Sequence, residues 1–236
     1  MSRPDSASLA DAPALADAPA LAPGGVDTAP RQAPLTASGE LRRAEILEAA
    51  ASLFDELGFH RTTTAAIADR VGTAKATVYH YFKAKHDILY AIHDEWIDEL
   101  LSLFEATTAT TDDPVLVVGA VMRDIVALID QKPGHVRVFF EYFRELPPEM
   151  QRSAKVKRDR YEELVESAIL HGMKEGSIAW QNPRTASFAL FGMCNWAYQW
   201  YRPGGALTHD EVSDQLFNIF MSGVGSRGFT ERSADA

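Results

Sequence analysis

Cysteine is nearly absent from this chain of 236 residues, whose single example is Cys194. One thiol excludes an internal disulfide framework and any metal site built from several thiolates, so we interpret Cys194 as a small core residue. Apolar runs are short, and none approaches the roughly 18 residues that cross a bilayer. The N-terminus also lacks the basic segment and apolar stretch of a secretory signal. These absences predict a cytoplasmic protein with no place in the membrane.

Motifs of catalysis and metal binding are missing as well. The chain has no Gly-x-Ser-x-Gly, no His-Glu-x-x-His and no Glu-x-x-His, and its seven histidines are scattered. Residues 223–228 fit Gly-x-Gly-x-x-Gly, but they follow an expected helix instead of a strand and lack a βαβ unit. The sequence therefore predicts no catalytic residue, no cofactor and no metal.

The net charge of the chain is −10, but it is unevenly distributed. Residues 40–86 carry seven basic and six acidic groups, whereas residues 87–236 carry 14 basic and 23 acidic groups. Contacts with phosphate depend on the local field and not on the net charge of the chain. The acidity of the second segment therefore does not exclude nucleic-acid binding by the first.

Proline content and apolar spacing divide the chain into segments. Residues 1–39 contain six prolines, no aromatic residue and ADAPAL twice in tandem, which predicts a disordered leader. From residue 40 the pattern predicts an all-α fold of about nine helices with no strand, and residues 229–236 form an expected flexible tail. The expected helices span 40–57, 64–71, 74–82, a long fourth one, then 114–131, 135–146, 149–171, 183 to the turn at 203–205, and 208–223.

The second and third expected helices, joined at Gly72 and packed on the first, have the layout of a three-helix DNA-reading unit. Val78 and Phe82 are four residues apart and can face the core. The other side chains of the third helix are mostly long or hydroxylated, which suits contacts with DNA. Lys75 can reach guanine O6 and N7, and the methyl group of Ala76 can touch a thymine methyl.

Residues 61–90, RTTTAAIADRVGTAKATVYHYFKAKHDILY, resemble the DNA-binding domain of TetR-family repressors. The resemblance implies a DNA-binding domain over residues 40–86 and a ligand-binding and dimerisation domain over residues 87–228. It implies base contacts by Lys75, Ala76, Thr77 and Tyr79, and contacts with the DNA backbone by Thr64, Thr73, His80, Tyr81 and Lys85. Thr64 is also an expected cap of the second helix. Ala74 stands where the family usually has serine, so Thr73 must supply the helix cap or the contact, and Tyr81 replaces a usual histidine.

Aromatic side chains are concentrated in residues 139–143 and 188–201. The second group has more aromatic surface than one helix face can bury, so part of it is expected to line a cavity or a dimer interface. Trp196 and Trp200 are four residues apart and share a helix face. The candidate ligand-binding residues are Trp96, Phe139, Phe143, Arg144, Trp196 and Trp200.

Residues 195–203, NWAYQWYRP, resemble a TetR branch that responds to coenzyme A thioesters of fatty or steroid-derived acids. This resemblance places Trp196 near the acyl group and pairs two subunits through the last two helices. The candidates for contacts with the coenzyme phosphates are Arg137, Arg144, Arg160 and Arg184, because guanidinium groups match phosphate geometry.

We therefore expect a homodimeric repressor that binds an inverted-repeat operator in double-stranded DNA and is released by a small molecule. The effector that the resemblance indicates is an acyl-CoA thioester. Three alternatives stay open. The first is a TetR-like regulator of the efflux type that responds to another hydrophobic effector. The second is a helical enzyme that uses acyl-CoA, and the third is a helical scaffold without DNA binding. Salt-sensitive operator binding would exclude the last two.

Overall fold

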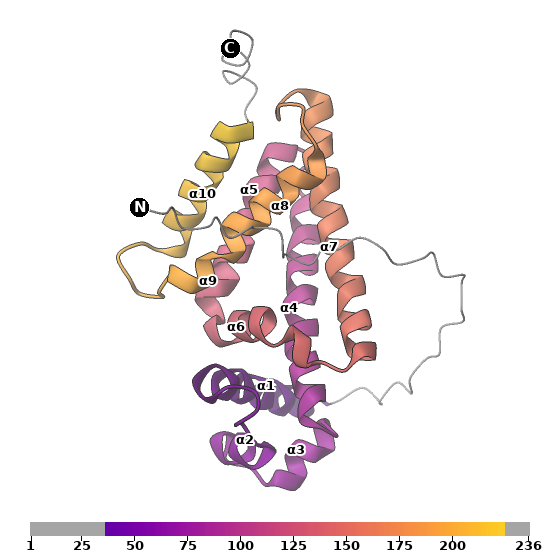
Figure 1. Cartoon of the computed structure of the whole chain (residues 1–236), viewed down its shortest axis with the longest axis vertical. Coiled ribbons are helices and arrows are strands. Elements are labelled where there is room, and N and C mark those ends of the chain that lie inside the picture. The colour runs from indigo at the N-terminus through magenta and orange to yellow at the C-terminus, as the bar shows by residue number, and fades with distance from the viewer. Residues whose placement is uncertain (1–35, 225–236) are drawn as a thin grey trace, which may run out of the picture. The chain divides into compact units, whose positions relative to one another are not determined.

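The computed structural model describes residues 36–224, and every regular element in this range is helical, which confirms the predicted all-α fold (Figure 1). The elements are α1 (Ala37–Leu57), α2 (Thr64–Val71), α3 (Lys75–Tyr81), α4 (Lys85–Thr108), α5 (Pro114–Gln131), α6 (Pro133–Glu141), the 3-10 helix η1 (Phe143–Glu145), α7 (Pro148–Glu175), α8 (Pro183–Asn195), α9 (Ala197–Trp200) and α10 (His209–Val224). None of these helices is long and apolar enough to cross a membrane. Within the same range, no group of three or more His, Cys, Asp or Glu side chains could hold a metal ion.

Helix α1 begins at Ala37, three residues before its predicted start. The last proline of the N-terminal segment is Pro34, so no proline ring interferes with helical hydrogen bonding from Ala37 onward. The predicted leader is therefore too long by residues 37–39. Its earlier part and the predicted tail, residues 229–236, lie outside the described residues.

Helices α1, α2 and α3 and the first half of α4 share one hydrophobic core. Phe54 of α1, Ile67 of α2 and Val78 of α3 are fully buried in it. On α4, Ile92 belongs to this core, whereas Trp96, one turn later, belongs to a second and larger core. Because α4 is continuous, it joins the three-helix unit to the helices that follow.

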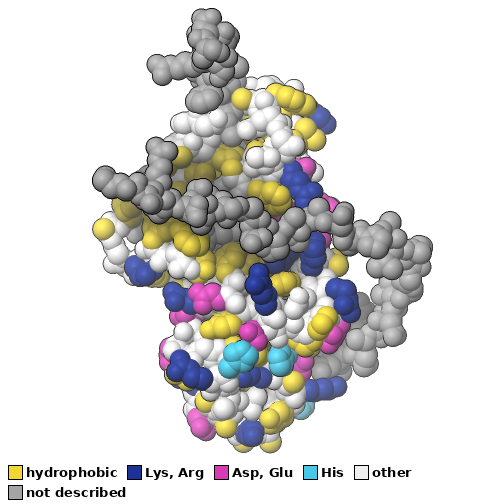
Figure 2. All heavy atoms as spheres, viewed as in Figure 1, with side chains coloured by type: hydrophobic (Ala, Val, Ile, Leu, Met, Phe, Trp, Pro, Cys, Tyr) yellow, Lys and Arg dark blue, Asp and Glu magenta, His cyan; other side chains and the backbone are white. Residues whose placement is uncertain are grey.

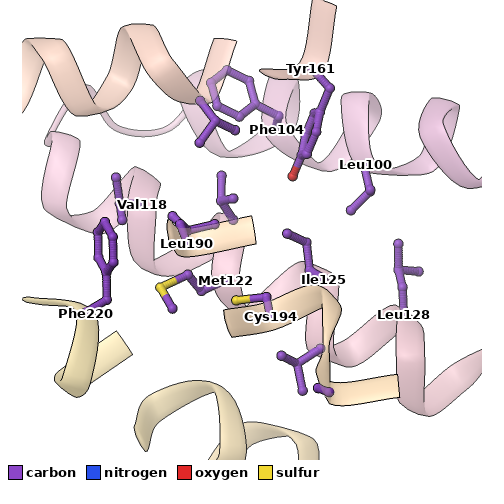
Figure 3. Packing of buried hydrophobic residues seen from close by; sticks show 14 of the residues in the cluster. Leu100, Phe104, Val118, Met122, Ile125, Leu128, Tyr161, Leu190, Cys194 and Phe220 are labelled. Carbon is purple, nitrogen blue, oxygen red and sulfur yellow. The ribbon is translucent and has the colours of Figure 1, made fainter. Parts of the chain in front are cut away.

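The second core is built around α5, which contacts α4, α7, α8 and α10 (Figure 3). Met122 and Ile125 of α5 are buried in this core together with Leu190 and Cys194 of α8. The Cys194 side chain is fully buried, and burial raises the pKa of its thiol to about 12. The interpretation of Cys194 as a core residue is confirmed.

Helix α7 runs to Glu175, four residues past its predicted end at residue 171. Gly172, which was expected to follow the helix, lies inside it. A Cβ atom at Gly172 would lie 2.7 Å from Cδ1 of Ile178, so a larger residue here would require the Ile178 side chain to shift. The helix ends instead at Gly176, whose φ of +80° is the left-handed conformation of a helix C-cap.

The predicted eighth helix is interrupted at Trp196, which divides it into α8 and α9 and turns nine predicted helices into ten within residues 36–224. Ala197 and Tyr201, just beyond the break, are buried, and the Tyr201 hydroxyl donates to Asp130 of α5 over 2.6 Å. These contacts hold the segment against α5. The predicted sixth helix also ends early, at Glu141, and η1 follows it.

Candidate nucleic-acid interface and ligand pocket

The turn between α2 and α3 is closed by Gly72, which adopts a φ of +70°. Its N–H group donates to the carbonyl oxygen of Asp69, and the N–H group of Thr73 donates to that of Ala68 over 2.9 Å. These bonds end α2 and reverse the chain at once. A residue with a side chain is strained at this φ, so the backbone requires the glycine that the sequence places here.

Three consecutive threonines at the start of α2 have separate roles. The hydroxyl of Thr62 is buried and bonds to two carbonyl oxygens of the preceding segment. Thr63 is the N-cap of α2, because its backbone is extended and its hydroxyl accepts from the N–H group of Ala66 over 3.1 Å. The predicted cap, Thr64, is therefore wrong by one residue. Its hydroxyl lies 3.1 Å from the hydroxyl of Tyr79 and links α2 to α3.

Helix α3 has one buried apolar face and one exposed polar face. Val78 and Phe82 are buried, as predicted. The ammonium group of Lys75 lies 5.6 Å from the centre of the Tyr79 ring. Basic and histidine side chains are visible over the end of the molecule that α1, α2 and α3 form (Figure 2). Of the predicted DNA-contact residues, Lys75, Ala76, Tyr79 and His80 are exposed, and Thr64, Thr73, Thr77 and Tyr81 are half-buried. Their contact with DNA stays a prediction.

The start of α3 differs from its prediction. Ala74 is the N-cap residue, and no side chain accepts a hydrogen bond from the first turn of α3. Thr73 ends α2 through its backbone and does not cap α3, so that part of its prediction is wrong. Tyr81 packs edge-on against His80, with 5.1 Å between the ring centres, and borders the first core. Part of the Tyr81 ring therefore serves packing.

Lys85 is placed differently from the other predicted DNA contacts. Its ammonium group donates to the carbonyl oxygens of Phe59 and Thr62 over 2.6 and 2.9 Å, and it lies 4.3 Å from the centre of the Phe59 ring. Partial burial lowers its pKa. A phosphate contact would require these bonds to break. In this structure Lys85 holds the segment between α1 and α2 against the start of α4, and its contact with DNA stays a prediction.

We expect Lys85→Ala to lower the free energy of unfolding by about 1–3 kcal/mol, because it removes the donor of these carbonyl groups. The salt dependence of DNA binding should be unchanged if Lys85 keeps these carbonyl bonds when the chain is on DNA. Lys83→Ala is the matched control, because Lys83 is exposed two residues away. Urea unfolding and DNA titrations at several salt concentrations measure both quantities. A flatter salt slope for Lys85→Ala, but not for Lys83→Ala, would show that Lys85 contacts a phosphate.

A pocket of about 380 Å³ lies where α6, η1 and α7 meet. It is lined by Phe139, Phe140, Glu141, Phe143, Arg144 and Arg158. Three predicted ligand-binding residues, Phe139, Phe143 and Arg144, are thus brought together at one place. It is half open to solvent and its exposed lining is more polar than apolar, so its use as a ligand site stays a prediction.

The other three predicted ligand-binding residues do not line this pocket. Trp96 is buried behind it, with 6.0 Å between its ring centre and that of Phe139. Trp196 and Trp200 are 63% and 48% exposed. They share an outer face, because the opposite side of their segment, with Tyr201, is held in the core. The exposed surface of the two tryptophans fits the other predicted use, a contact between subunits.

Of the four arginines predicted for coenzyme phosphates, only Arg144 borders the pocket. Arg137 pairs with Asp55 of α1 at 2.9 Å. Arg184 lies over the ring of Phe188, and Arg160 is exposed on α7. These three positions give no support to a shared phosphate site.

The sequence prediction misses Arg158, which lines the pocket, and His93, which lies behind its aromatic residues. His93 is buried on α4, and its ring packs against Phe139 and Phe143 with centre distances of 5.1 and 5.7 Å. The guanidinium group of Arg158 lies 5.1 Å from the centre of the Phe143 ring. One signal was available: His93 precedes Trp96 by three residues, so it interrupts the apolar face of a helix with a polar ring.

Helix α6 also rests on α1. The two helices touch at Gly134, where a Cβ atom would be in van der Waals contact with the backbone of α1 at 3.4 Å. Arg137 pairs with Asp55 of α1, and the Tyr142 hydroxyl just after α6 donates to the carbonyl oxygen of Phe54 over 3.3 Å. The segment that lines the pocket is therefore in direct contact with the three-helix unit.

Two family models match the two halves of the chain. "Bacterial regulatory proteins, tetR family" matches residues 46–92, from α1 into α4. "Tetracyclin repressor-like, C-terminal domain" matches residues 112–224, from the segment before α5 to the end of α10. The division between the two matches falls along α4 and the segment after it.

Known proteins resemble the chain over most of its length. The HTH-type transcriptional repressor KstR2 of Rhodococcus jostii is 28% identical over 187 residues, which are 78% of this chain and 92% of the relative. AibR, crystallised with isovaleryl coenzyme A and operator DNA, has a TM-score of 0.68 and 26% identity over 75% of this chain and 97% of its own. A TetR/AcrR-family regulator from Thermobifida fusca has a TM-score of 0.62 and 32% identity over 79% of this chain and 99% of its own. The chain belongs to the TetR family of bacterial transcriptional regulators.

Proposed function

We propose that this chain is a homodimeric repressor that binds an inverted-repeat operator through α3 and releases it when a small molecule occupies the pocket beside α6. The observation that carries the proposal is the exposed polar face of α3, supported from behind by a buried apolar face. Repression is supported by KstR2, a transcriptional repressor that aligns with this chain over 92% of its own length. A protein that acts on operator DNA works in the cytoplasm, where we place it.

The proposed dimer interface is the outer face of α8 and α10. Phe188, Trp196 and Ile219 are 47%, 63% and 63% exposed there, and α8 contacts α10. Figure 2 shows apolar side chains on the surface of this end of the molecule. Exposed apolar patches favour association, and a two-fold dimer uses the same patch on both subunits. The two α3 helices are then related by the symmetry of an inverted repeat.

The pocket is positioned to affect DNA binding because it shares a segment with the α1 contact. Phe139 and Phe143 form its aromatic walls, whereas Arg137 and Tyr142 of the same segment bond to α1. If the pocket segment can adopt two positions, a ligand that binds one of them better increases its population. Because this segment is bonded to α1, α1 moves with it. Release of the operator follows if that position differs from the one that fits DNA.

The effector class that we propose is an acyl-CoA thioester. AibR, which is 26% identical to this chain, was crystallised with isovaleryl coenzyme A and operator DNA. A pocket of about 380 Å³ suits the acyl group, with the coenzyme extending outward past the exposed Arg144. The alternative, a hydrophobic effector without coenzyme, would use the same aromatic walls. Operator release by a thioester but not by its free acid would separate the two.

Selection from random DNA by the full chain, followed by footprinting, should yield an inverted repeat. Lys75→Ala should weaken operator binding by about 1–3 kcal/mol and relax the base preference at one position of each half-site, because a lysine at this place reads guanine edges. Lys83→Ala, exposed but outside α3, should leave the base preference unchanged. Equal losses on operator and random DNA for Lys75→Ala would contradict the base contact.

A further inference from the structure

His93 is a buried polar side chain whose hydrogen-bonding groups are unused. It is 1% exposed, and neither Nδ1 nor Nε2 has a hydrogen-bond partner in residues 36–224. Burial, with a smaller contribution from Arg158, lowers the pKa of His93 to about 3, so the ring is neutral near pH 7. A neutral imidazole has one donor and one acceptor, and leaving both unpaired in a core is unfavourable.

The His93 ring lies against the inner wall of the pocket. Phe139 and Phe143 both line the 380 Å³ pocket and both pack on this ring, with centre distances of 5.1 and 5.7 Å. Phe143 belongs to the three-residue helix η1, is half-buried and packs on the edge of the first core. His93 itself does not line the pocket, so a ligand must displace the Phe143 side chain to reach its ring.

Arg158 adds positive charge to the same end of the pocket. Its guanidinium group lies 5.6 and 5.1 Å from the ring centres of Phe139 and Phe143. No carboxylate in the described part of the chain lies within 4.0 Å of it, in contrast to Arg137, which is paired. Arg158 can therefore hold a ligand carboxylate or polarise a carbonyl oxygen.

We infer that His93 is a specificity-determining residue of the effector pocket, where its imidazole hydrogen-bonds an oxygen on the buried part of the effector. The inference rests on the proposed function, since it takes this pocket as the effector site. The effector is then an apolar acyl compound with a keto or hydroxyl oxygen on its skeleton, and its acid or thioester end lies toward Arg158. A plain hydrocarbon skeleton leaves the imidazole unpaired and binds less tightly.

Isothermal titration calorimetry of the full chain tests this inference with two matched probes, cyclohexanecarboxylic acid and 4-oxocyclohexanecarboxylic acid. Each probe is used as the free acid and as the coenzyme A thioester, which distinguishes the two sources of the acyl group. We expect the 4-oxo compound to bind about tenfold to a hundredfold more tightly. His93→Leu should remove this preference, and His93→Gln, which keeps a donor and an acceptor, should restore part of it.

Three binding results would overturn the inference: equal binding of the plain and oxo probes, no binding of any probe, or an unchanged preference in His93→Leu. A fall in Tm of more than about 5 °C for His93→Leu at pH 7.5 would also overturn it, because the ring would then be paired within the protein. Binding of the selected inverted repeat without any probe is measured in parallel. If one of these contrary results is found while DNA binding is intact, only the inference about His93 fails. If the chain does not bind the inverted repeat, the proposed function fails.

Discussion

Replacing Ile219 with arginine should lower the affinity for the inverted-repeat operator by about a hundredfold to ten-thousandfold. Ile219 is 63% exposed on α10, next to α8. In a two-fold dimer the substitution places two positive charges in one apolar interface, so the subunits separate. A monomer holds one half-site at a time, and the gain from binding both half-sites through one molecule is lost. Analytical ultracentrifugation measures the oligomeric state, and fluorescence anisotropy with whole and half operators measures the affinity.

The matched control is Val156→Arg on α7. Val156 is 68% exposed, so the substitution adds the same charge to a site of similar exposure outside α8 and α10. This variant should stay dimeric and keep its operator affinity. If Ile219→Arg behaves in the same way, the subunits pair through another surface.

Acidification should destabilise the chain through His93. Burial, and to a smaller extent Arg158, lowers the pKa of His93 from 6.5 to about 3. As the pH falls below 6.5, the unfolded chain takes up a proton that the native ring does not bind, so the free energy of unfolding decreases between pH 6.5 and pH 3. At pH 5 the loss relative to pH 7.5 should be about 2 kcal/mol.

His93→Leu should abolish this part of the acid destabilisation, which urea unfolding at pH 7.5 and pH 5.0 measures. Other groups titrate in the same range, including His135, whose pKa burial also lowers. The quantity to compare is therefore the difference between the original chain and the variant. His171→Leu is the control, since the His171 side chain is 46% exposed on α7. Equal acid losses in the original chain and His93→Leu would contradict a neutral buried ring.

The three-helix unit could be predicted closely because its signals are local. The αL conformation at Gly72 and the four-residue spacing of Val78 and Phe82 depend on neighbouring residues alone. The differences there arose from side chains with two available partners. Lys85 could reach a phosphate or a backbone carbonyl, and the structure places it on carbonyl groups that lie more than 20 residues earlier in the chain.

The pocket was predicted only in part, because its walls come from separate helices. Phe139 and Phe143 are close in the sequence and could be singled out together, whereas His93 and Arg158 join them only when α4 and α7 pack on either side. Trp196 is the opposite case: its place in an aromatic group favoured a pocket residue, but the structure turns its side chain outward. Spacing predicts that residues share a face, but not which face is buried.

By itself the sequence determined the helical class, most helix ends and the DNA-reading unit, because capping, turn geometry and apolar periodicity act over a few residues. The tertiary structure decided which polar groups are left without partners and which aromatic face is exposed. It turned Lys85 toward backbone carbonyls, directed Trp196 and Trp200 outward, and buried His93 beside Phe139. These outcomes depend on packing between distant helices, where burial removes water as the alternative partner of each polar group.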